Sequence, residues 1–154
     1  MNSSSVKLNY SPQFFLKSFL DLTKARLAIS VVFSSIVGYL LAVDSFDFYT
    51  LTLLSIGGYC MVGASNSFNQ IIERDIDALM DRTKNRPIPS NKISVNTAFY
   101  ISVILTLIGI VVLYKINPRT ALFGAISIFI YTITYYFIKT FTHYYSHFTI
   151  HITH

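Results

Sequence analysis

Two long stretches of this chain, 27–43 and 51–72, contain no charged side chain. An α-helix rises 1.5 Å per residue, so roughly 20 apolar residues cross the hydrocarbon core of a bilayer, which is about 30 Å thick. Charged residues make up only 12% of the chain, against roughly 25% in ordinary soluble domains. The chain is therefore predicted to be an all-α protein that crosses a membrane several times.

Four apolar segments are long enough to be membrane spans, and short links or one long charged loop separate them. The spans are predicted at about 27–43, 50–72, 95–114 and 120–138. Together they predict a polytopic membrane helix bundle of about four transmembrane helices over 27–138. The remaining segments are an N-terminal arm (1–26), a charged loop (73–94) and a tail (139–154).

The basic residues lie almost entirely on one side of these spans. Lys115 and Arg119 fall on one side, and all other Lys and Arg fall in the arm, in the charged loop or at Lys139. Because cytoplasmic loops carry the excess of basic residues, the N-terminus and the charged loop are predicted to be cytoplasmic at a cell membrane. This topology also explains the net charge of +5, so nucleic acid is not expected as a partner. The arm lacks an apolar core and a cleavage site, so no removed signal peptide is expected.

Polar side chains recur every fourth residue where the second span meets the charged loop. On an α-helix this spacing places oxygen atoms on one face, one turn apart. Oxygen ligands suit a hard cation, and Mg²⁺ typically binds one or two carboxylates together with substrate phosphates. Basic residues follow closely, as a diphosphate requires. The candidate metal ligands are Asn69, Glu73, Asp77 and Asp81, and the candidate diphosphate-binding residues are Arg82, Lys84 and Arg86. On spacing alone, a solvated helix end with paired charges is the more common arrangement, and this alternative stays open.

Three motifs resemble the UbiA-type intramembrane prenyltransferases, and in particular the heme o synthase (protoheme IX farnesyltransferase) family. The first is the array Asn69-x3-Glu73-x3-Asp77, followed by Arg-Thr-Lys-Asn-Arg-Pro. The others are the entry to the first span, 23–27, and the approach 63–69. The resemblance covers about 20–131, and the pair Tyr135 and Lys139 extends it to Lys139. Ala25 stands where the family usually has Pro, and Glu73 stands where the wider superfamily has Asp.

This resemblance implies a fold, a reaction and residue roles. Asn69, Glu73 and Asp77 would be catalytic by holding Mg²⁺ against farnesyl diphosphate. Four basic residues would lie near the diphosphate, namely Arg82, Lys84, Arg86 and Lys139. The implied acceptor is heme B and the implied product is heme O, formed within the lipid bilayer. The fold implied is a UbiA-type prenyltransferase fold truncated to about four transmembrane helices.

The family also carries a second aspartate-rich motif in its later half, whereas this chain has no Asp or Glu beyond Asp81. We therefore expect the chain to have little activity alone. Two alternatives stay open: prenyl transfer to an aromatic quinone precursor, and a non-enzymatic four-span scaffold. The oligomeric state cannot be predicted.

The tail 139–154 differs from the rest of the chain in composition. The resemblance is expected to fail beyond Thr140, where Gly, Pro, acids and Lys or Arg are absent. This narrow set of residues favours degenerate sequence or sequence read out of frame, although a plain interfacial tail is also open. All four histidines lie here, and their spacing on one helical face would also suit a metal site: His143, His147, His151 and His154.

Overall fold

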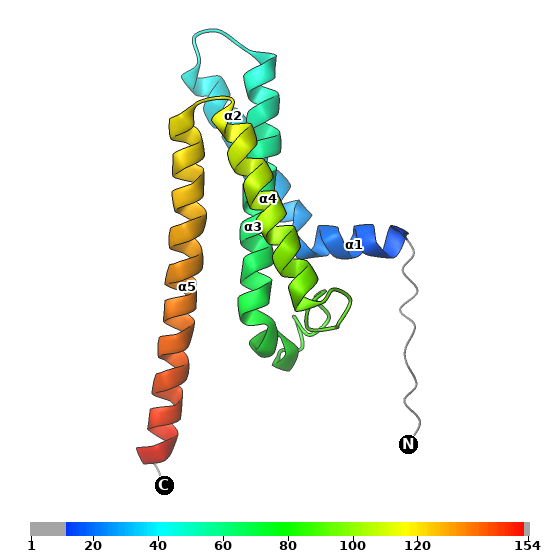
Figure 1. Ribbon diagram of the computed structural model, residues 1–154, viewed down its shortest axis with the longest axis vertical. Coiled ribbons are helices and arrows are strands. Elements are labelled where there is room, and N and C mark those ends of the chain that lie inside the picture. The colour runs from blue at the N-terminus through cyan, green and yellow to red at the C-terminus, as the bar shows by residue number, and fades with distance from the viewer. Residues whose placement is uncertain (1–11, 153–154) are drawn as a thin grey trace.

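The computed structural model describes residues 12–152, with side chains for 12–141, and all regular structure in this part of the chain is α-helical. Four of its five helices are long and apolar enough to cross a membrane, which confirms the predicted polytopic helix bundle (Figure 1). The helices are α1 (Pro12–Leu22), α2 (Ala25–Ala42), α3 (Phe48–Leu79), α4 (Val95–Tyr114) and α5 (Pro118–Ile152).

The helix bounds differ from the predicted spans mainly at the end of the bundle that holds the charged loop. Helix α4 covers the predicted span 95–114, but α3 runs through Leu79, so the first residues of the predicted loop 73–94 are helical. Helix α5 continues to Ile152, so most of the backbone of the tail 139–154 is helical. The side chains of His143, His147, His151 and His154 lie outside the described part, so their metal-site interpretation stays a prediction.

Side-chain caps explain where two of the long helices begin. The Asp47 carboxylate accepts hydrogen bonds from the backbone N–H groups of Tyr49 and Thr50 at 3.1 and 3.0 Å, which satisfies two donors at the start of α3. The Thr50 hydroxyl also donates to Asp47, and these bonds lower the pKa of the Asp47 carboxyl below its usual value. Ser94 caps α4 in the same way through the Thr97 N–H, at 3.1 Å.

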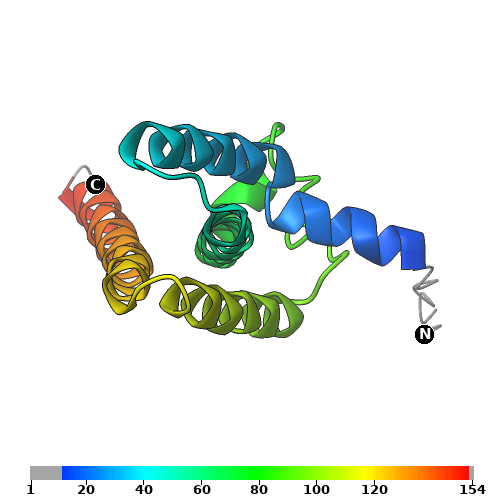
Figure 2. The ribbon, with the colours of Figure 1, turned by 90° about the horizontal axis from the view of Figure 1, so that it is seen from above.

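Helix α3 is the central helix of the bundle and lies between α2 and α4 (Figure 2). Small residues let the helices approach closely, as is common in lipid, where packing drives association. A Cβ atom added at Gly57 of α3 would lie 2.7 Å from Leu113 of α4. Large apolar side chains on the outer faces, such as Leu41 and Phe129, are exposed and would contact lipid.

Helix α1, which lies inside the predicted arm 1–26 and was not predicted, runs crosswise to the other helices and meets α2 in a sharp turn (Figure 1). Lys24 in this turn has a left-handed backbone with φ 49°. Two amides of α3 hold the turn: the Gln70 Nε2 donates to the Leu22 carbonyl at 2.8 Å, and the Asn66 Nδ2 donates to the Thr23 carbonyl at 2.9 Å. Because Gln70 is next to Asn69 in α3, the turn is held beside the array of Asn69, Glu73 and Asp77.

Candidate functional site: a carboxylate and cation cluster at the end of α3

Three of the predicted site residues, Asn69, Glu73 and Asp77, lie one turn apart on the last part of α3. Asn69 and Asp77 are buried, the latter with only 3% of its surface exposed. The Asn69 Nδ2 donates to the Glu73 Oε2 at 2.9 Å, which joins two members of the array directly. The spacing therefore does bring an amide and two carboxylates together on one helix face, as predicted.

Arg86 returns from the charged loop to this array and joins the two carboxylates. Its Nη1 donates to the Asp77 Oδ2 at 2.6 Å and to the Glu73 Oε2 at 3.3 Å. A guanidinium between two carboxylates offsets their mutual repulsion, which is large where water is scarce. The burial of Asp77 is therefore compensated by a fixed positive charge.

The loop that carries Arg86 is packed against the bundle. The Thr83 hydroxyl, itself buried, donates to the Asp77 carbonyl at 3.1 Å just beyond the end of α3. Ile88 and Ile93 are buried with Leu22 of α1 in one hydrophobic cluster. Because these contacts lie on both sides of Arg86, its guanidinium is positioned by the folded loop.

Helix α5 contributes a second row of polar side chains to the same cluster. The Tyr131 hydroxyl donates to the Asn69 Oδ1 at 3.2 Å, and the Tyr135 hydroxyl donates to the Glu73 Oε1. One turn further along, the Lys139 Nζ donates to the Ile72 carbonyl. Lys139, which the family resemblance implied near the diphosphate, therefore lies beside the array. The role of Tyr131 was missed, because nothing in the local sequence relates it to Asn69.

Lys24 is a second residue that the sequence analysis did not place at the site. Burial lowers the pKa of the Lys24 ammonium below its usual value of 10.5, and the nearby charge of Arg86 lowers it further, whereas Glu73 and Asp77 oppose these effects. These interactions show that Lys24 shares the electrostatic environment of the α3 array. The available signal was its place in the segment 23–27, which carries one of the family motifs.

The structure does not bring every predicted residue into the cluster. Asp81 follows the end of α3 at Leu79, so the four-residue repeat does not keep it on the helix face with Asp77. Its side chain is 97% exposed and accepts a hydrogen bond from the Lys84 Nζ at 2.7 Å. Arg82 is exposed in the same loop. The prediction that Asp81 lies on the same helix face as Asp77 is therefore wrong. The metal-ligand role of Asp81 and the diphosphate-binding roles of Arg82 and Lys84 stay predictions.

The donor chemistry of the array fits one hard divalent cation. Two carboxylates and an amide oxygen are the ligands that such an ion prefers, and substrate phosphates usually complete its shell. Within the described residues no group of three His, Cys, Asp or Glu side chains is close enough to hold a metal alone. Arg86 instead takes up oxygens of both Glu73 and Asp77. A cation would therefore have to share or replace this arginine contact.

Taken together, these features define a polytopic α-helical membrane protein with a carboxylate and cation cluster at one end of its spans. The chain belongs to the UbiA prenyltransferase family, whose model matches residues 31–152. The family recognised from the three motifs is thus confirmed. The match also continues beyond Thr140, where the resemblance was expected to fail.

Individual relatives agree with this assignment. A protoheme IX farnesyltransferase of Flavobacterium psychrophilum is 64% identical over 127 residues, which cover 80% of this chain and 42% of that protein. A protoheme IX farnesyltransferase of Christiangramia forsetii is 58% identical over 137 residues, covering 89% and 46%. The chain spans less than half the length of these relatives.

One solved structure has the same fold. It is described as giving structural and mechanistic insights into the biosynthesis of digeranylgeranylglyceryl phosphate synthase in membranes. The TM-score is 0.74 at 26% sequence identity, and the likeness covers 79% of this chain and 43% of that chain. The helix arrangement described above is therefore shared with another membrane protein of known structure.

Proposed function

We propose that the chain carries the prenyl-diphosphate side of an intramembrane farnesyltransferase whose second substrate is heme B and whose product is heme O. The observation that carries this proposal is the Glu73 and Asp77 pair joined by Arg86, in a chain similar to protoheme IX farnesyltransferases. A buried cluster with both carboxylates and cations can bind a metal and a diphosphate together, which a topology-setting loop would not need.

Each residue of the cluster has a distinct role in this proposal. UbiA-type prenyltransferases generally use a divalent metal with the diphosphate substrate, and here we propose Mg²⁺ held by Asn69, Glu73 and Asp77. When bound, this ion would neutralise charge on the leaving diphosphate. Arg86 would exchange its carboxylate contacts for the diphosphate oxygens, and Lys24 would add a second positive charge. Lys139 donates to the Ile72 carbonyl of α3 and would contribute a third positive charge near the diphosphate.

The reaction begins when the allylic carbon–oxygen bond of farnesyl diphosphate breaks. Both electrons of that bond leave with the diphosphate, where positively charged side chains stabilise the developing charge. The π electrons of a heme vinyl group then form the new carbon–carbon bond. Water adds to the resulting cation and loses a proton, which gives a hydroxyethylfarnesyl group.

Binding of labelled farnesyl diphosphate to the purified chain in lipid nanodiscs tests the diphosphate side. We expect Mg²⁺-dependent binding that Asp77→Asn reduces by at least tenfold. Asp75→Asn is the matched control, because it is the same substitution on the same helix. The Asp75 side chain is exposed, and its Oδ1 lies 3.0 Å from the Arg74 Nε. Equal binding by both variants would favour the non-enzymatic scaffold.

Product analysis separates the two prenyltransferase candidates. In a host that lacks its own enzyme, mass spectrometry should detect heme O, rather than a prenylated quinone precursor, when a relative's later half is supplied with this chain. With the chain alone we expect no heme O, because the chain has no Asp or Glu beyond Asp81. Heme O formed by the chain alone would contradict this expectation. A prenylated aromatic product would mean that the acceptor is a quinone precursor and not heme B.

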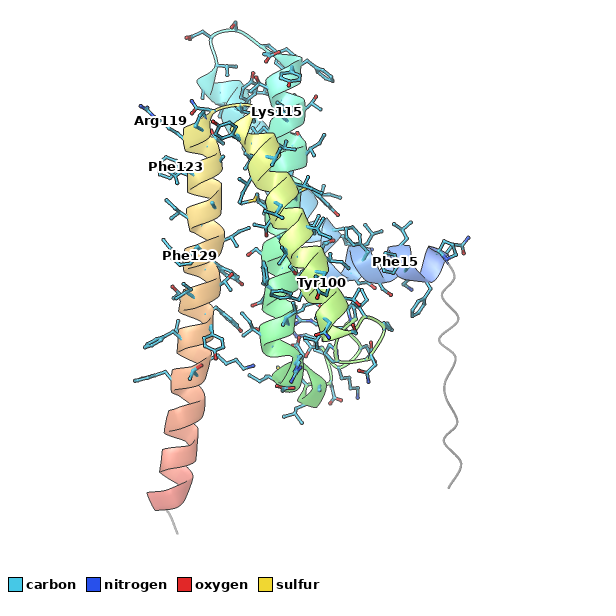
Figure 3. The ribbon with its side chains drawn as sticks, in the orientation of Figure 1. Phe15, Tyr100, Lys115, Arg119, Phe123 and Phe129 are labelled. Atoms are coloured by element: carbon cyan, nitrogen blue, oxygen red, sulfur yellow. The ribbon has the colours of Figure 1, made fainter. Side chains whose placement is uncertain are left out.

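The chain is a multi-pass membrane protein, and we propose that the cluster faces the cytoplasm. Arg74 lies on the part of α3 that carries the array, and Arg86 and Lys139 donate hydrogen bonds to it. Lys115 and Arg119 lie at the opposite end of the bundle (Figure 3). The excess of basic residues marks the cytoplasmic side. Cys60 is the only cysteine, so in a Cys60→Ala background a cysteine at exposed Asp81 should react with an impermeant reagent only after the cell membrane is opened.

A further inference from the structure

Helix α1 ends at Leu22, three residues before the first span begins at Ala25. Helix α2 has 18 residues, which correspond to about 27 Å at 1.5 Å per residue, close to the roughly 30 Å of a hydrocarbon core. Its first residue, Ala25, must therefore lie near one boundary of that core. Because α1 runs crosswise to the bundle at this point (Figure 1), its axis would lie along the membrane surface, at the boundary of the hydrocarbon core.

The side chains of α1 are divided as they are in helices that lie in a membrane interface. Ser18 and Leu22 are buried against the bundle. Leu16 and Leu20, one turn apart, are 58% and 41% exposed, and Phe15 beside them is also exposed (Figure 3). Exposed apolar side chains at the level of the bilayer boundary indicate contact with acyl chains.

A hollow with a basic lining lies between α1 and the start of α2. Its volume is about 640 Å³, and its charged lining consists of Lys17, Lys24 and Arg26 with one carboxylate, Asp21. Leu20 and Leu27 form an apolar part of the same lining. Positive charge therefore adjoins apolar surface at the height where lipid headgroups meet acyl chains.

We propose that α1 is an interfacial helix and that this hollow binds the headgroup of an anionic phospholipid. The three cations complement the phosphate, and the apolar lining extends to where the acyl chains of that lipid begin. A free phosphate would leave the exposed apolar side chains without a partner. This site adjoins the proposed diphosphate site at Lys24, which lines the hollow and also lies near the α3 array. Lys17 and Arg26 distinguish the two sites, because they belong to α1 and α2 and line only the hollow.

A single tryptophan tests the position of α1. The chain has no Trp, so Phe15→Trp in the otherwise unchanged chain gives one fluorescent reporter. In nanodiscs its emission should be quenched more by lipids brominated near the headgroup end of the acyl chains than by lipids brominated near the tail end. No quenching by either lipid, as expected if protein or water covers α1, would overturn the proposal, and so would stronger quenching by the deeper label.

Native mass spectrometry of the chain released from mixed phosphatidylcholine and phosphatidylglycerol tests the hollow. The double variant Lys17→Gln, Arg26→Gln should lower retention of phosphatidylglycerol by roughly 25-fold, since each basic residue near a membrane surface contributes about fivefold. Arg74→Gln with Lys92→Gln removes the same charges from the α3 end and the loop, and should leave retention within about twofold. An equal loss in both double variants, or no loss in either, would overturn the proposal.

Discussion

The Arg86 guanidinium donates to the Asp77 carboxylate at 2.6 Å, although Arg86 belongs to a loop and Asp77 lies in the last turn of a membrane-spanning helix. The same nitrogen lies 3.3 Å from Glu73. This arrangement gives Arg86 two functions in our account: it stabilises the folded loop when no substrate is present, and it supplies positive charge when a diphosphate is bound. The following predictions separate these functions.

Removing the guanidinium should destabilise the protein. Arg86→Gln leaves the buried Asp77 carboxylate with weaker hydrogen bonding, and we expect a loss of about 1–3 kcal/mol in the free energy of unfolding. Thermal unfolding in detergent measures this loss. The exposed neighbour provides the control, since Arg82→Gln should change stability by less than about 0.5 kcal/mol.

A double variant shows whether the two residues act through their contact. Asp77→Asn combined with Arg86→Gln removes both charges, so the combined loss should be smaller than the sum of the two single losses, by about 0.5–3 kcal/mol. Strictly additive losses would mean that Arg86 stabilises the loop without Asp77.

The two ends of the acidic array should respond differently to the same substitution. Asp81→Asn should leave Mg²⁺-dependent farnesyl diphosphate binding within about twofold, because Asp81 is exposed beyond the end of α3 and pairs with Lys84. Asp77→Asn should reduce this binding by at least tenfold. If Asp81→Asn alone abolished binding, the loop would have to rearrange so that Asp81 joins the site.

Lys24 should make stability depend on pH in the alkaline range. Its pKa is lower in the folded protein than the usual 10.5, so the folded protein binds this proton less tightly than the unfolded chain does. The destabilisation is therefore full below the lowered pKa and disappears as pH rises towards 10.5.

Lys24→Met keeps the backbone but removes the charge, so it should be more stable than the unchanged protein at neutral pH. This difference should shrink as pH rises, and melting temperatures of both proteins at a series of pH values would show it. A difference that stays constant or grows would contradict the assigned direction of the pKa. The same variant should bind farnesyl diphosphate less tightly, since Lys24 is proposed to contact the diphosphate.

The same substitution should have opposite effects at two glycines, Gly57 at the contact of α3 with α4 and Gly38 on an open face of α2. At Gly57 a methyl group would lie 2.7 Å from the Leu113 Cδ2, so Gly57→Ala should cost about 1–3 kcal/mol of stability. At Gly38 nothing lies within 4 Å of the added atom, so Gly38→Ala should stabilise the helix by about 0.5–1 kcal/mol. Unfolding in detergent tests both, and equal effects would mean that the α3 and α4 contact is looser than described.

Local patterns predicted much of the fold, because apolar runs and helix periodicity are properties of neighbouring residues. The span 95–114 coincides with α4, and the four-residue spacing correctly stacked Asn69, Glu73 and Asp77. The same spacing failed at Asp81, because Met80 is extended (φ −98°, ψ 127°) and Thr83 takes the Asp77 carbonyl. No Gly or Pro at position 80 marks this helix end in the sequence.

Other parts of the site depend on contacts between distant segments and have no local signal. Tyr131 and Tyr135 reach α3 from 62 residues away, and only the fold brings them there. Likewise, Gln70 holds the turn before α2 through backbone carbonyls, which no side-chain pattern reveals. The short helix α1 was missed because its apolar residues are too few to resemble a span.

The central claim is that Glu73 and Asp77 hold a divalent cation together with a diphosphate while Arg86 releases them. Electron paramagnetic resonance of Mn²⁺, as a probe for Mg²⁺, measures this directly with the chain in nanodiscs. We predict weak Mn²⁺ binding by the chain alone, at least tenfold tighter binding with farnesyl diphosphate, and loss of that gain in Asp77→Asn but not in Asp75→Asn. Equal Mn²⁺ binding by Asp77→Asn and the unchanged chain would contradict the claim.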